Sequence, residues 1–107
     1  MVEALKVLGI LVLENFKKKH AQSRGALNAW LVEAKSAKWS SMNDIWQRYP
    51  KASLMKKTDS RIIFNIKGND YRLAVQASFK SGILKIEWIG THAEYDKKDF
   101  SGDKNGN

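Results

Sequence analysis

The side chains best suited to chemistry in this chain lie in its second half. Arg72 carries a planar guanidinium that can hold two oxygens of a phosphate at once. His92 precedes Tyr95 by three residues, so the two share one face if this stretch is helical. A histidine exchanges protons near neutral pH, so His92 is either a proton-transfer group or a packing residue after a strand. Asp96 can orient a ring nitrogen of His92 or cap the helix.

These residues belong to a short, basic chain. It has 107 residues, 19 basic against 11 acidic side chains, a net charge of +8 and no cysteine. The length fits one domain, residues 1–100, followed by a polar, glycine-rich tail at 101–107 that we expect to be disordered. The lack of cysteine excludes disulfides, thiol nucleophiles and cysteine-bound zinc, and two histidines argue against a structural metal site. We therefore predict no metal and no cofactor.

The positive charge is concentrated where the sequence predicts strands. Residues 51–91 hold eight basic and three acidic side chains, a net +5. Such a surplus favours a polyanionic partner, although lysines can also simply keep a small protein soluble. The apolar run Val7–Leu13 is far shorter than the roughly 20 residues of a membrane span and lacks the flanks of a signal peptide. We expect a cytoplasmic protein with no membrane contact.

The first half of the chain is predicted to be mostly helical. Apolar residues recur with helical spacing between residues 21 and 38, and Trp30 lies on the buried face. Pro50, the only proline, stops the helix before it. The predicted elements are a strand over about Leu5–Ile10, a helix from near Val12 with a solvated end at Lys17–His20, a helix within 21–38, and a short helix over Met42–Tyr49.

The second half alternates apolar and polar residues as strands do. Strands are predicted over Arg61–Ile66, Tyr71–Phe79 and from Ile83, separated by turns at Lys67–Asp70 and Lys80–Gly82. In the third strand, Leu84, Ile86 and Trp88 are assigned to the core face, and Ile83, Lys85, Glu87 and Ile89 to the opposite face. Two hairpins of this kind predict an α+β fold, in which an N-terminal strand and helices pack on one face of a C-terminal antiparallel sheet.

The other face of that sheet is polar and mostly basic. It is expected to carry Arg61, Asn65, Arg72, Gln76, Ser78 and Lys85, with Glu87 as the only acid. Such a face is either a solvated outer surface, where Arg72 pairs with Glu87 across the strands, or a concave surface for nucleic acid. The alternation alone does not choose between the two.

Two blocks of sequence carry a family resemblance. The first is Phe64-Asn-Ile-Lys-Gly-Asn-Asp-Tyr-Arg-Leu73, and the second, some twenty residues later, is Thr91-His-Ala-Glu-Tyr-Asp-Lys97. Trp39, Asp44-Ile45 and Tyr49-Pro-Lys-Ala52 add to it. From about Leu5 to Lys98 the chain resembles the HigB family of bacterial toxin-antitoxin modules, within the RelE-like superfamily.

The resemblance implies a small RelE-like domain that cuts messenger RNA on the ribosome and thereby inhibits translation. In that superfamily the 2′-OH of the substrate is the nucleophile, no metal or small-molecule cofactor is used, and a helix-turn-helix antitoxin of the HigA type holds the toxin inactive. The alternative is a non-catalytic basic module that binds RNA or a protein through the polar sheet face. Antitoxin-free expression and cleavage assays discriminate the two.

Site residues follow from the resemblance together with the chemistry above. Arg72, His92 and Tyr95 are the catalytic candidates, although Tyr95 can instead pack over the sheet edge, and which group acts as the base stays open. The candidates for RNA binding are Lys57, Arg61, Lys67, Asn69 and Lys85. Among these, Asn69 also shapes the turn between the predicted strands Arg61–Ile66 and Tyr71–Phe79.

Overall fold

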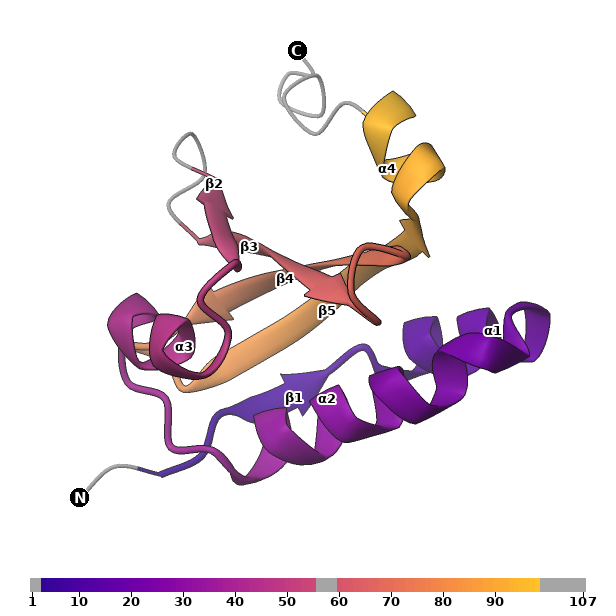
Figure 1. Ribbon diagram of the computed structural model, residues 1–107. Helices are drawn as coiled ribbons and strands as arrows, with labels where there is room; N and C mark the ends of the chain where they lie inside the picture. Colours follow the sequence, from indigo (N-terminus) through magenta and orange to yellow (C-terminus); the bar gives the residue numbers. More distant parts are fainter. Residues whose placement is uncertain (1–2, 56–59, 99–107) are drawn as a thin grey trace, which may run out of the picture.

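The computed structural model describes residues 3–55 and 60–98 (Figure 1). The predicted tail at 101–107 and Lys57 lie outside the described residues. No helix in the part described is both long and apolar enough to cross a bilayer. The elements are β1 (Lys6–Leu8), α1 (Ile10–Lys19), a 3-10 turn (Ala21–Ser23), α2 (Arg24–Ser36), α3 (Met42–Arg48), β2 (Ser53–Met55), β3 (Arg61–Ile66), β4 (Tyr71–Ser78), β5 (Ile83–Thr91) and α4 (His92–Lys97).

The strands form one mixed sheet in the order β1-β5-β4-β3-β2. The two predicted hairpins, β3–β4 and β4–β5, are present and antiparallel. Two edge strands complete the sheet: β2 is antiparallel to β3, and β1 is parallel to β5, with Lys6 opposite Ile83. The α+β class is therefore confirmed, and β1 is a member of the sheet, added by a long-range pairing that no local pattern indicates.

Helices α1 and α2 cover one face of the sheet, while α4 rises from the other side (Figure 1). On the covered face, Leu27 and Trp30 of α2 are buried in the same apolar cluster as Phe64 and Leu73 of the sheet. The rings of Trp30 and Phe64 meet edge to face, with centroids 5.3 Å apart. The prediction that Trp30 is a core residue is confirmed.

A β-bulge at Glu87 reverses the predicted facing of the end of β5. Val75 is opposite Ile86 and Ala74 is opposite Trp88, so Glu87 is the extra residue between two aligned pairs. One extra residue turns every later side chain to the other face of a strand. The assignment of Trp88 to the core and Ile89 to the opposite face was therefore wrong. Ile89 is buried in the core cluster, and Trp88 packs on the outer face, the face turned away from α1 and α2.

The expectation of a solvated end to the first helix was wrong for Lys17. Its side chain is buried, and its amine contacts Glu14 at 2.9 Å and donates to Asn28 Oδ1 of α2 at 2.7 Å. Because a long aliphatic stem can pack on apolar surface while the amine finds partners, a lysine can join two helices from inside. Lys17 thus ties α1 to α2 beneath the sheet.

Candidate active site on the outer face of the sheet

Three polar side chains of the outer face form one network across β3, β4 and β5. Arg61 Nε donates to Glu87 Oε1 at 2.8 Å, and Gln76 Nε2 donates to Glu87 Oε2 at 2.7 Å. Arg61 is only 9% exposed. The sequence left open whether Glu87 pairs with Arg72. In the structure the Glu87 carboxylate pairs with Arg61. The bulge places Glu87 where it can serve both partners, so Arg61 has a structural role.

Arg72 is held in a different way, by the backbone and side chain of the adjacent turn. Its Nη1 donates to Asn69 O at 3.2 Å and to Tyr71 O at 3.3 Å, and its Nη2 approaches Asn69 Oδ1 at 3.4 Å. Within residues 3–55 and 60–98 no carboxylate forms an ion pair with Arg72. Its guanidinium is thereby oriented by neutral acceptors.

Helix α4 follows β5 directly and is fixed at its first residue. The hydroxyl of Thr91 accepts from the Glu94 amide at 3.1 Å, while the Glu94 carboxylate accepts from the Thr91 amide at 2.8 Å, which forms a capping box. The His92 amide also donates to Asp70 O in the turn before β4. These bonds anchor a helix of only six residues against the β3–β4 turn that also holds Arg72.

The two α4 candidates have different surroundings. His92 is exposed, and its Nδ1 lies 3.0 Å from Asp96 Oδ2, the contact that the first of the two roles predicted for Asp96 requires. This contact fixes which ring nitrogen faces the carboxylate and leaves Nε2 as the other polar atom of the imidazole. Tyr95 is half-buried, and its ring centre lies 5.9 Å from the guanidinium carbon of Arg72. The β4 arginine and the α4 tyrosine thus form a cation–π pair.

A family model described as HigB_toxin, RelE-like toxic component of a toxin-antitoxin system, matches residues 23–98. The chain belongs to this family. The match runs from the 3-10 turn before α2 through α4, and so includes all three catalytic candidates. No curated protein matches the chain. The resemblance read from the sequence is confirmed, and this HigB-family chain is the toxin of a toxin-antitoxin system.

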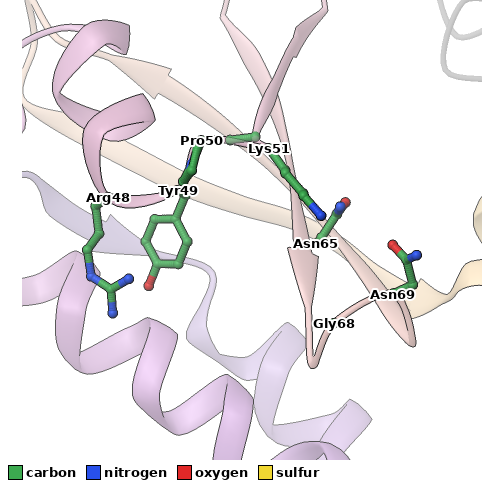
Figure 2. Close-up of a pocket in the computed structure, with 8 residues that line it drawn as sticks. Arg48, Tyr49, Pro50, Lys51, Asn65, Gly68 and Asn69 are labelled. Carbon is green, nitrogen blue, oxygen red and sulfur yellow. The ribbon is translucent and has the colours of Figure 1, made fainter.

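A pocket of about 400 Å³ in this HigB-family toxin is lined in part by Asn69, the residue that accepts hydrogen bonds from Arg72. The segment after α3 and the β3–β4 hairpin line it, with Lys51, Asn65 and Asn69 among the polar residues (Figure 2). Figure 2 shows the Lys51 side chain extending toward Asn65. Asn69 both lines the pocket and accepts hydrogen bonds from Arg72, so one residue connects the pocket with this guanidinium.

One side of this pocket is organised by Arg48 and Tyr49. Arg48 pairs with Glu33 at 3.2 Å and lies 4.8 Å from the centre of the Tyr49 ring. Burial raises the pKa of the Tyr49 hydroxyl above its usual value. Sequence reasoning did not place Lys51 in a site, and it put Asn65 on the polar sheet face without naming it a site residue. The two segments quoted for the resemblance that contain them, Tyr49–Ala52 and Phe64–Leu73, were the signal that could have found them.

The remaining RNA-binding candidates are not brought together. Lys67 occupies a left-handed turn position with φ 54° and lies 4.0 Å from Asp70. Lys85 is exposed opposite Gln76, four residues along β4 from Arg72, or about 13 Å at the rise of a strand. In the part of the chain that the structure describes, no three His, Cys, Asp or Glu side chains converge as metal ligands would.

Proposed function

We propose that this toxin is an mRNA endoribonuclease that acts on the ribosome and inhibits translation. The observation that carries the proposal is the guanidinium of Arg72, which is held between Asn69 and Tyr95, while the exposed His92–Asp96 pair lies on the same short helix as Tyr95. A cation oriented by neutral groups together with a proton-exchanging imidazole is suited to a phosphodiester whose own 2′-OH attacks phosphorus.

In the proposed reaction the 2′-oxygen of the substrate forms a bond to phosphorus as its proton passes to a base. The bond to the 5′-oxygen breaks, and that oxygen takes up a proton, leaving a 2′,3′-cyclic phosphate and a 5′-OH end. We assign the charge that develops on the phosphoryl oxygens to Arg72. His92 Nε2 exchanges the proton while Asp96 holds Nδ1. Tyr95 positions Arg72 and faces the same phosphate.

The proposal requires no metal or cofactor, because Arg72 supplies positive charge and the substrate supplies the nucleophile. It places the toxin in the cytoplasm, where translation occurs. We further propose that the antitoxin carries a helix-turn-helix domain and that acidic side chains of its inhibitory segment face the basic surface around Arg72.

The test is inducible expression in cells without the antitoxin, followed by cleavage of messenger RNA on purified ribosomes. We expect growth arrest and fragments that end in a cyclic phosphate and a 5′-OH. Replacement of the 2′-OH at the cut site by 2′-deoxy abolishes cleavage. Arg72→Gln and His92→Gln each lower the cleavage rate by about 100-fold or more.

The matched control is Lys35→Gln, which removes an exposed cation from α2 and leaves cleavage unchanged. Normal growth with abundant folded toxin would contradict the proposal. So would fragments with 3′-OH and 5′-phosphate ends, because these require water as the nucleophile. RNA binding without any cleavage would identify the chain as a non-catalytic module.

A further inference from the structure

A groove runs along β5 beyond the point where its pairing with β1 ends. β1 pairs only with residues 83–85, and two hollows of about 440 and 320 Å³ adjoin the later part of β5. Both are lined by Phe16 and Lys19 of α1 and by Trp88 and Ile89 of β5. We call this continuous depression between α1, β5 and α4 the β5 groove.

Trp88 is presented to this groove by two features of the backbone. The bulge at Glu87 turns it out of the core, and Gly90 leaves room for its ring. A Cβ atom at position 90 would lie 2.5 Å from Cη2 and Cζ2 of the indole, closer than such atoms approach. The indole therefore lies along the strand because residue 90 has no side chain.

The charges that line the β5 groove favour an anion. Lys19, Lys97 and Lys98 contribute cations, and Lys98 Nζ lies 6.0 Å from the centre of the Trp88 ring. The two acids of the lining are engaged elsewhere: Glu94 accepts from the amide of residue 91, and Glu87 accepts from residues 61 and 76. An aromatic ring among lysines is the arrangement that holds single-stranded nucleic acid.

The groove is continuous with the candidate active site through Tyr95. The ring centres of Trp88 and Tyr95 are 6.3 Å apart, and Tyr95 in turn contacts Arg72 at 5.9 Å. A strand whose phosphate sits at Arg72 can therefore place a neighbouring base on Trp88 without leaving the protein surface.

We propose that the β5 groove is a binding site for single-stranded RNA, in which a base next to the cleaved position stacks on Trp88 and the lysines contact phosphates. This binding site rests on the proposed ribonuclease function, and it adds the path that the substrate strand takes over the protein. The recognition is tolerant of sequence, because every base offers a ring face to stack.

The test is ultraviolet cross-linking to a short single-stranded RNA that carries 5-iodouridine and has 2′-O-methyl groups, so that it is not cut. Trypsin cleaves after Lys85 and Lys97, and we expect the RNA on the peptide of residues 86–97, attached to Trp88. Trp46 on α3 is 39% exposed and lies in a different peptide, residues 39–48, so it is an internal control that stays unmodified.

Binding of the same RNA is measured by fluorescence anisotropy. A comparison of variants at position 88 distinguishes a loss of base stacking from a loss of folding. Trp88→Leu weakens binding about fivefold or more, whereas Trp88→Phe keeps it within about twofold. Gly90→Ala, which displaces the indole but retains it, also weakens binding. Lys98→Gln lowers the salt dependence by about one unit of slope, and Lys35→Gln leaves it unchanged.

Three results would contradict the proposal that the β5 groove binds RNA. These are no binding by the wild-type toxin at about 100 µM in low salt, a cross-link at Trp46 in place of Trp88, or a Trp88→Leu variant that binds RNA normally but loses the antitoxin. Growth arrest together with any of these results would reject the groove and leave the nuclease standing. A cross-link at Trp88 without cleavage on ribosomes would reject the nuclease and leave an RNA-binding surface.

Discussion

The face of the sheet covered by α1 and α2 is lined by apolar side chains such as Phe64, Leu73 and Leu84, whereas the outer face joins Arg61, Gln76 and Glu87 by hydrogen bonds. The same strands supply both faces, since successive residues point to opposite sides. The covered face excludes water around the centre of the domain. The outer face fixes the direction of individual polar groups. Most of the apolar core is thus separated from the polar network by the thickness of one sheet.

The separation predicts that the largest loss of stability comes from the covered face. Phe64→Ala removes a fully buried ring that packs on Trp30, Trp39 and Tyr49 and leaves a cavity. We expect the free energy of unfolding to fall by about 3 to 5 kcal/mol in urea titrations. Val32→Ala, at a position that is 67% exposed, is the control and changes it little. Equal effects would show that the two positions are not distinguished by burial.

An intermediate loss is expected from the hydrogen-bonded network of the outer face. Glu87→Ala removes the carboxylate that holds both Arg61 and Gln76, and should cost about 2 kcal/mol of unfolding free energy. The matched variant is Glu33→Ala, because Glu33 also binds an arginine Nε but at an exposed site. That change should cost less than about 1 kcal/mol. Urea titration at the same pH measures both, and similar costs would contradict a structural role for Arg61.

The smallest effect on stability, within about 0.5 kcal/mol, is expected at Arg72. Arg72→Gln removes a half-buried cation whose partners are backbone oxygens and one amide. Thermal unfolding of the purified variant should be nearly unchanged while growth arrest is lost. Arg24→Gln, an exposed cation at the start of α2, keeps both properties. An Arg72 variant that unfolds readily would assign this arginine to the structure of the sheet and remove it from the chemistry.

The central hairpin and the buried face of the long helix could be predicted from the sequence. Alternation over Arg61–Ile66 and Tyr71–Ser78, with a turn between, determined the central hairpin and the facing of Arg72. Helical spacing placed Trp30 in the core. β2 was missed because three residues are too few to display alternation, and the pairing of β1 with β5 joins segments that are distant in the chain.

The sequence predicted which residues belong to the candidate site better than it predicted the contacts between them. Arg72, Tyr95 and the His92–Asp96 pair came from chemistry and family resemblance, and the structure adds their geometry. The bulge at Glu87 could not be predicted, because Trp88 and Ile89 are both apolar and either can face the core. Whether a bulge forms depends on the partner strand. Lys17 was misassigned for the same reason, since its partner Asn28 is on another helix.

The parallel pairing of β1 with β5 has a consequence for the order of events during synthesis. β1 is made first, but its partner residues 83–85 are translated only after every other strand of the sheet. Gly9, which turns the chain from β1 into α1, passes so close to β5 that a Cβ there would lie 2.5 Å from the Ile86 carbonyl oxygen. This edge of the domain therefore closes only after residues 83–85 have been synthesised, which is slow, non-local folding. The toxin thus cannot complete its sheet until the strand Ile83–Thr91 has left the ribosome that makes it.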